Sequence, residues 1–377
     1  MEISTAQAET MAFLNNDLCY DILRRLDGQT LASAACACAA FYSISREEKL
    51  WENVCASMWP STNRDDVKSL ILSIGGFKKF YADCFPLIVN KEFTEYRRNE
   101  YLEYPDEWME AEYYGDIDEL ESTSPSDFVS LVDIRFRDQP ICSKVLWGVP
   151  NTNGSNLWFY SCPFRVDLLN YSASEEDRDF HQGRGITLSE SNGLPSILSM
   201  ETERKDGKLW QELRDGIRLS WIIVNRKEKQ AANFSSWIPL GGQRHWPTDK
   251  DFVIRFGSIL PARDVLPCQV AECVLVMKFK LTREGSSTAL RLKELSMQLE
   301  DMEGAHVNGR NSLSILKEAL SCRRSRNYGE VLESCRLYSK VQSELKEEKL
   351  RNENRIDRLC ILSGIAAFAT LCCYYIL

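Results

Sequence analysis

The amino-acid sequence predicts an α+β multidomain protein with N-terminal helices, a central antiparallel β-sandwich-like domain, and C-terminal helices that end in a single transmembrane helix. Three observations support this prediction. Apolar residues recur at helical spacing in the first eighty residues and again after Gly304, and they alternate with polar residues in between. No helical pattern of useful length separates the alternating stretches, which disfavours parallel crossovers. The last nineteen residues, 359–377, contain no charged side chain.

The composition is that of an ordinary globular protein. With 377 residues, of which 44% are hydrophobic, the chain has room for two or three domains. Its net charge of -9 argues against a nucleic-acid partner, because neutralising phosphates requires a surplus of Lys and Arg. The short basic run at 323–326 is expected to be a solvated face.

Cysteine and histidine usage predicts neither disulfides nor a metal site. The fourteen cysteines include no C-x-x-C pair, and no secretory signal precedes them, so they are expected to be reduced. The three histidines, His181, His245 and His306, lack zinc-ligand spacing. No nucleophile elbow, Walker loop or dinucleotide fingerprint is present. We therefore expect no metal, no cofactor and no enzyme activity.

The first eighty residues predict short helices. Asn15 or Asn16 can cap the first, and Asp27-Gly28 should end it, since glycine tolerates a left-handed exit. Its apolar positions lie on one helical face and are Leu18, Ile22, Leu23 and Leu26. A second helix is expected over Leu31–Phe41, capped by Thr30.

A third helix is expected to begin at Ser45, in a capping box with Glu48. Its apolar side carries Leu50, Trp51, Val54 and Met58. The three helices together have more apolar surface than their own small core can bury. Exposed apolar patches of this kind mark a protein interface.

The order of residues in these helices resembles the F-box, over residues 12–59. The resemblance is carried by Asp17-Leu18, Ile22-Leu23, Leu26, Thr30-Leu31, Ala35-Cys36, Phe41 and Leu50-Trp51. The sequence departs from many F-boxes in having Asn15 after Leu14, where proline is common. Two longer stretches are similar to a small plant subgroup that includes the cytokinin-induced F-box protein, which implies a place in the cytokinin response. They are DGQTLASAACACAAFYSISREEKLW and LSWIIVNRKEKQAANFSSW.

The resemblance implies a non-catalytic subunit of a cullin-based, SCF-type E3 ubiquitin ligase. An F-box docks on the Skp-type adaptor and so ties an unknown protein substrate to the ligase, which raises the effective concentration of the substrate lysine. One sequence does not separate the residues that bind the adaptor from those that form the core of the F-box. The combined set is Leu14, Asp17, Leu18, Ile22, Leu23, Leu26, Leu31, Phe41, Leu50 and Trp51.

Composition shifts divide the rest of the chain. Residues 95–127 carry twelve acidic and two basic side chains, a run that repels itself and predicts a linker. The predicted divisions are 12–59 for the F-box, 60–94 for a helical extension, 95–127 for the acidic linker, 128–303 for a β-rich substrate-recognition domain, 304–358 for a helical stalk and 359–377 for a tail anchor.

Alternation in the central region predicts strands with one solvent-exposed face. Val132, Ile134 and Phe136 would face the core, while Asp133 and Arg135 would face water. Further strands are expected at Leu157–Ser161, Ile217–Val224, Phe252–Phe256, Leu275–Leu281 and Leu295–Leu299.

The sequence does not identify the ligand of the β-rich region. An F-box followed by a β-sandwich resembles plant F-box proteins with phloem-lectin-like domains, so a protein substrate and a glycan are both candidates. Four residues in a loop-rich section are the candidate substrate-binding residues: Trp237, Arg244, His245 and Trp246.

The tail 359–377 is long enough, at about 28 Å in helical form, to cross the hydrocarbon core of a bilayer. Arg358 and the basic residues before it favour a cytosolic N-terminal portion. A single-pass membrane location follows, with nucleus and cytoplasm as the alternative if the tail does not insert. A buried C-terminal helix would also be apolar all round.

Two functions are consistent with these features. The first is a substrate receptor of a ubiquitin ligase, tethered to a membrane by residues 359–377. The second is a membrane-bound lectin-like or scaffold protein that acts without a cullin. Loss of the adaptor on deleting residues 12–59 is the test that the sequence suggests.

Overall fold

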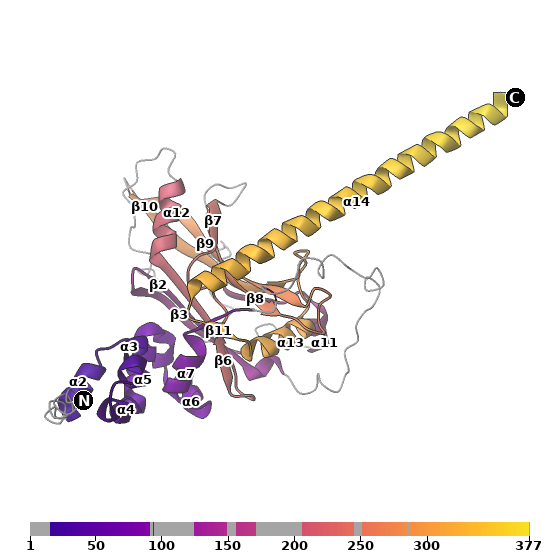
Figure 1. The fold of residues 1–377 in the computed structure, drawn as a ribbon. Coiled ribbons are helices and arrows are strands. Elements are labelled where there is room, and N and C mark those ends of the chain that lie inside the picture. The colour runs from indigo at the N-terminus through magenta and orange to yellow at the C-terminus, as the bar shows by residue number, and fades with distance from the viewer. Residues whose placement is uncertain are drawn as a thin grey trace, which may run out of the picture.

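The computed structural model describes residues 16–90, 93, 124–148, 156–170, 206–244, 251–284 and 287–376. It consists of a helical layer at the N-terminal end, two β-sheets, and a long C-terminal helix that projects away from them (Figure 1). The helical layer contains α2 (Asn16–Leu23), α3 (Gly28–Ala34), α4 (Ala39–Ile44), α5 (Glu48–Met58), the 3-10 helix η1 (Pro60–Asn63), α6 (Asp65–Ser73) and α7 (Phe77–Cys84).

The second predicted helix is in fact two helices, because α3 ends at Ala34 and α4 begins at Ala39. The cap is Asp27 rather than Thr30: the Asp27 carboxylate accepts hydrogen bonds from the Thr30 amide (2.9 Å) and hydroxyl (3.1 Å). Gly28 is the first residue of α3 and makes no left-handed exit. A Cβ on it would lie 2.2 Å from the Cζ atom of Tyr81, so glycine is required by the close approach of α7.

The predicted capping box at the start of the third helix is also wrong. The Ser45 hydroxyl donates to the Tyr42 carbonyl (2.8 Å), and α5 has no side-chain cap. The Glu48 carboxylate instead accepts the backbone amide of Phe77 at the start of α7. Glu48 therefore caps a different helix, which anchors α7 on α5.

Two sheets form the central region, as the alternation predicts. Among the described residues, the six-stranded sheet has the order β11-β1-β6-β5-β2-β3 and the five-stranded sheet has the order β4-β10-β9-β8-β7. All pairings are antiparallel except that of β1 with β6. The strands of the first sheet are β1 (Leu87–Ile88), β2 (Phe128–Phe136), β3 (Gln139–Trp147), β5 (Ile217–Asn225), β6 (Gln230–Asn233) and β11 (Arg324–Ser325); those of the second are β4 (Arg165–Asn170), β7 (Gly241–Arg244), β8 (Asp251–Pro261), β9 (Val270–Glu284) and β10 (Ser287–Glu300).

The strand expected at Leu157–Ser161 is a helix, α11 (Asn156–Ser161). A short apolar run does not distinguish a buried strand from a buried helix by periodicity. Here α11 lies on the start of α13 (Gly309–Leu320), where the Phe159 carbonyl would be 2.3 Å from a Cβ on Gly309. A further helix, α12 (Asp206–Gly216), precedes β5, and the short 3-10 helix η3 (Pro125–Asp127) precedes β2.

The central strands β2 and β5 of the six-stranded sheet are buried on both faces, so the expected solvent-exposed face of β2 is wrong. Phe128, Val132 and Ile134 of β2 point into the core between the sheets. On the other face, Val129 and Leu131 join a second core with the helices. The sheet also contributes Ile222 and Val224 of β5 and Ala231 of β6 to this second core, and the half-buried Val145 of β3 packs against it. The helical layer thus covers the face of the sheet that was predicted to be exposed to solvent.

The C-terminal helix α14 (Tyr328–Ile376) has two parts. Its first turns pack on the five-stranded sheet, where Tyr338 lies in a cluster with Phe93, Ile259, Val270 and Met302. The Tyr338 hydroxyl donates to the Asp301 carbonyl (2.8 Å). Contact continues to Lys349, which pairs with Glu303 (3.1 Å), and after it the helix projects from the rest of the molecule, drawn in yellow in Figure 1.

The predicted transmembrane tail is wrong. Within the part of the chain that the structure describes, no helix combines the length and the apolar composition needed to cross a bilayer. The membrane partner and the single-pass location rested on this tail, and they are withdrawn with it.

Candidate functional site

The exposed surface of α2 includes two aliphatic side chains. Leu18 is 50% exposed and Ile22 is 40% exposed, while Cys19 and Leu23 are buried. The two sets follow from helical geometry, because residues four apart lie on the same face. The exposed face of α2 therefore carries two large aliphatic side chains that the helical layer does not cover.

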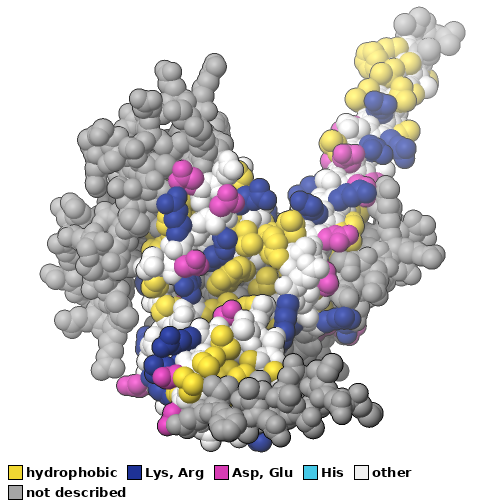
Figure 2. Space-filling model, turned by 60° about the vertical axis from the view of Figure 1, so that its left-hand side comes forward, with side chains coloured by type: hydrophobic (Ala, Val, Ile, Leu, Met, Phe, Trp, Pro, Cys, Tyr) yellow, Lys and Arg dark blue, Asp and Glu magenta, His cyan; other side chains and the backbone are white. Residues whose placement is uncertain are grey.

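Helix α4, which packs against α2, carries an exposed aromatic side chain. Tyr42 is 53% exposed, and the Arg46 guanidinium lies 5.9 Å from the centre of its ring. Phe41 is half-buried against the helical core. In Figure 2, hydrophobic side chains gather beside Lys and Arg side chains at the lower end of the molecule, where the helical layer lies. We call Leu18, Ile22 and Tyr42 the apolar helix face.

The structure separates the predicted adaptor-binding residues into two sets. Asp17, Leu18 and Ile22 are exposed, and Leu26 and Phe41 are half-buried. The buried set consists of Leu23, Leu31, Leu50 and Trp51. The Trp51 indole donates to the Ser45 carbonyl (2.7 Å), so it is held inside the layer. Leu14 lies outside the described residues.

Sequence reasoning missed Tyr42. Phe41 and Tyr42 are adjacent on a helix, so they point in different directions and only one of them can face the small core. That adjacency was the available signal. The Asp27 cap orients α3 beside this surface, and the hydrogen bond from the Thr30 amide holds the pKa of the Asp27 carboxyl below its ordinary value.

The helical layer is fixed to the six-stranded sheet by a buried carboxylate. Asp133 on β2 is 2% exposed and accepts hydrogen bonds from the Ser61 amide (2.9 Å), the Ser61 hydroxyl (2.6 Å) and the Ser143 hydroxyl (2.6 Å). Burial raises the pKa of the Asp133 carboxyl to about 6 in spite of these donors. We call this cluster, with the two contacts described next, the junction.

Two further contacts complete the junction. The Trp59 indole donates to the Ser220 hydroxyl (3.0 Å). The Arg135 guanidinium donates to the carbonyls of Ser57 (2.7 Å) and Met58 (3.3 Å), at the negative end of the α5 dipole. Polar residues of β2 and β5 thus hold the last turn of α5 and the start of η1.

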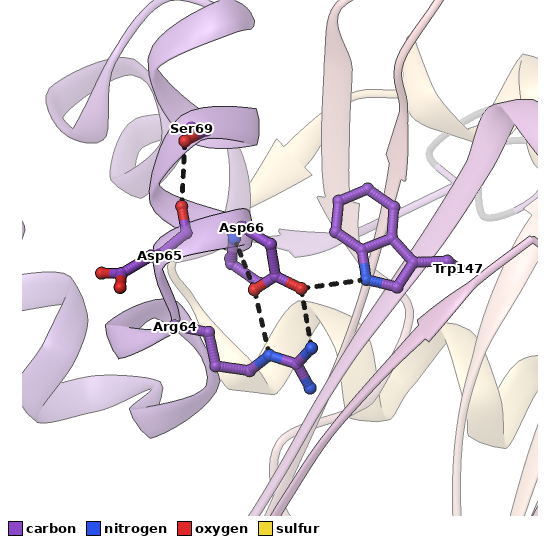
Figure 3. A network of polar contacts seen from close by, with 6 residues as sticks. Arg64, Asp65, Asp66, Ser69 and Trp147 are labelled. Carbon is purple, nitrogen blue, oxygen red and sulfur yellow. Dashed lines mark hydrogen bonds and ion pairs between the residues drawn. The ribbon is translucent and has the colours of Figure 1, made fainter. Parts of the chain in front are cut away.

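A more exposed network of polar contacts lies at the C-terminal end of β3, around Trp147 (Figure 3). Arg64 donates to both carboxylate oxygens of Asp66 (3.0 and 2.7 Å), and the Trp147 indole donates to one of them (3.3 Å). The hydrogen bonds from Arg64 are the main reason that the pKa of the Asp66 carboxyl is lowered. Asp66 therefore joins α6 to the end of β3.

The structure describes two of the four predicted substrate-binding residues, Trp237 and Arg244. Trp237 has a positive φ of 66°, and it is half-buried against a cluster that contains Val331. Arg244 ends β7, and His245 and Trp246 lie outside the described residues. Among the residues described, no group of three or more His, Cys, Asp or Glu could hold a metal ion.

Comparison with known proteins identifies the helical layer. Residues 16–57 match the family model described as F-box-like. The chain is 28% identical to F-box protein At2g27310 of Arabidopsis thaliana, over 100% of the chain and 99% of that protein, and 26% identical to Probable F-box protein At2g36090 of the same plant, over 98% and 94%. It is 34% identical to F-box protein GID2 of Oryza sativa subsp. japonica over 18% of the chain and 34% of that protein.

No solved structure matches the chain. The prediction of a plant F-box protein is confirmed by the F-box-like domain and by the whole-length similarity to Arabidopsis proteins of that name. The names of these relatives do not mention cytokinin, so the narrower resemblance to the cytokinin-induced subgroup stays a prediction. The match at 16–57 contains every described residue of the predicted adaptor-binding set.

Proposed function

We propose, from the premise that residues 16–57 form an F-box-like domain in a relative of plant F-box proteins, that the chain is the substrate-recognition subunit of an SCF-type E3 ubiquitin ligase. Its F-box binds a Skp-type adaptor, and through it a cullin. The sheets hold the substrate. The subunit contributes no reacting group; it raises the effective concentration of a substrate lysine near the ubiquitin-loaded enzyme.

The observation that carries this proposal is the apolar helix face. Leu18, Ile22 and Tyr42 are exposed although the layer has a complete core beneath them. Large exposed apolar side chains in one region are typical of a binding surface, and aromatic residues are enriched at the energetic centre of such surfaces. An adaptor that covers this face would remove the three side chains from water.

The test is co-purification of the Skp-type adaptor with the full chain and with the double variant Leu18→Asp/Ile22→Asp. Because burying each side chain stabilises the complex by about 1.5 kcal/mol, we expect the adaptor affinity to fall by about 100-fold or more. The melting temperature should not change, since both positions are exposed. Leu72→Asp, at a 56% exposed leucine on α6 outside the matched region, is the control and should bind the adaptor normally.

A variant at a buried leucine cannot serve in this test. Leu31 lies in the core of the helical layer, so Leu31→Asp would unfold the layer and abolish binding for that reason alone. Undiminished adaptor binding by the Leu18/Ile22 double variant, with the same melting temperature, would refute the proposed interface.

The location of the complex follows from its partners. We expect the chain in the nucleus and cytoplasm, since the proposed function requires the adaptor and the cullin. A fluorescent fusion of the full chain should therefore be seen in both compartments, and its absence from them would contradict this location. Co-purification with the cullin, measured in the same cells, tests the competing function of a lectin-like or scaffold protein without a cullin.

A further inference from the structure

Strand β3 is an edge strand whose outer side has no strand partner among the residues described. Its side chains are exposed or half-buried except for that of Cys142, whereas those of the neighbouring β2 are buried except for that of Arg135. The difference shows that β3 borders the sheet rather than lying inside it. Edge strands present a row of unpaired backbone groups.

The register shows which residues present these groups. The Gly148 amide donates to the Phe128 carbonyl (2.8 Å), and the pairing continues as Val129 opposite Trp147. In an antiparallel pair, hydrogen-bonded and non-hydrogen-bonded residue pairs alternate. The amides and carbonyls of Ser143, Val145 and Trp147 therefore point away from β2. No described residue forms a backbone hydrogen bond with them.

The two ends of β3 differ. Pro140 and the register shift between Ile134 and Arg135 disrupt the ladder near the start of β3. Prolines and bulges of this kind prevent pairing at an edge. The half from Ser143 to Trp147 has neither, so it presents three successive outward pairs of backbone groups.

Side chains beside this open half are apolar and cationic. Trp147 is 45% exposed, and the Arg226 guanidinium lies 5.8 Å from the centre of its ring. The Asp66 carboxylate holds the indole in place (Figure 3). Neither Lys144 nor Arg226 forms an ion pair with a carboxylate in the described part of the chain.

We propose that the edge from Ser143 to Trp147 binds an extended acidic segment of the substrate protein as an additional strand beside β3. Backbone hydrogen bonds to the three outward pairs provide affinity, and Lys144, Arg226 and the Trp147 ring select acidic and apolar side chains. This inference rests on the proposed function, because it names the class of substrate segment that the receptor takes.

The probe is a fluorescein-labelled peptide of about ten residues that alternates glutamate and valine, the spacing that gives a strand one charged face. Binding to the full chain is followed by fluorescence anisotropy, and amide hydrogen exchange locates it. Val145→Pro removes an outward amide without removing a hydrogen bond to β2. Val145→Ala is the matched control, since it loses the same side-chain packing but keeps the amide.

We expect the peptide to bind, to protect the amides of 143, 145 and 147 from exchange, and to bind Val145→Pro about tenfold or more weakly than Val145→Ala. Lys144→Glu should bind the acidic peptide more weakly than the natural chain does, and should bind a peptide that alternates lysine and valine more tightly. Equal binding by all variants, protection elsewhere, or no binding would overturn the proposal. So would protection of the β3 amides that rises with protein concentration, because a second copy would then occupy the edge.

Failure here is distinguishable from failure of the proposed function. Peptide binding uses the chain without its adaptor, and β3 is separate from the apolar helix face. Loss of peptide binding in Val145→Pro with normal adaptor co-purification supports both inferences. Normal adaptor binding without any peptide binding refutes only this one.

Discussion

Protonation of Asp133 should stabilise the folded chain. The pKa of this carboxyl is raised from its ordinary value of 3.8 to about 6, so the folded state binds a proton more tightly than the unfolded state. The contribution is fully present below the unfolded value and is lost as the pH rises through 6. With 1.36 kcal/mol per pKa unit, lowering the pH from 7.5 to 5 raises the free energy of unfolding by about 1.4 kcal/mol from this group alone.

The assay is urea denaturation at several pH values, followed by tryptophan fluorescence, for the natural chain and for Asp133→Asn. Trp59 lies in the junction and should report its opening. The substitution removes the titration of residue 133 and leaves the other carboxyl groups in place, so the difference between the two pH profiles isolates Asp133. Profiles that run parallel from pH 7.5 to 5 would show that the buried carboxyl does not titrate as inferred.

Two substitutions and one truncation test the packing. Gly28→Ala would place a Cβ 2.2 Å from a Tyr81 ring atom, so we expect a loss of about 1–3 kcal/mol in the free energy of unfolding; Gly241→Ala, with no atom within 4 Å of the added Cβ, is the control and should stay near the natural value. Trp59→Phe removes the hydrogen bond to Ser220 and should cost about 1–3 kcal/mol in the same assay; a neutral result would mean that this bond does not support the junction. Truncation after Leu350 removes a helix segment whose described side chains are almost all exposed, so the melting temperature should not change, and a large decrease would reveal packing that the exposed helix does not show.

The helices of the F-box-like domain were predictable from the sequence, but their roles were only partly so. Helical spacing places Leu18 and Ile22 on one face, and the family resemblance gives that face a partner. The spacing alone does not predict that Leu23, next to Ile22, lies in the core. Which face of α2 is buried depends on α5 and α7, which lie further along the chain. The structure supplies this direction.

The burial of Asp133 was not predictable from local sequence. Alternation around Val132 and Ile134 correctly gives a strand, and an aspartate on its other face normally indicates solvent. Here the covering residue is Ser61, which is 72 positions away in the chain. The transmembrane tail was predicted from the apolar run 359–377 and the charges that flank it, and no described helix is long and apolar enough to cross a bilayer.

The core that joins the helical layer to the six-stranded sheet has a consequence for how this protein can be dissected. Val129, Leu131, Ile222 and Val224 share one core with helix residues such as Trp59, so removing residues 12–59 would open this core to water even though η1 and α7 stay on the sheet. A deletion of the F-box would then abolish every activity of the chain, whether or not that activity needs the adaptor. The F-box therefore cannot be moved to another receptor by cutting the chain after residue 59. An exchange of this domain between proteins would have to include the six-stranded sheet.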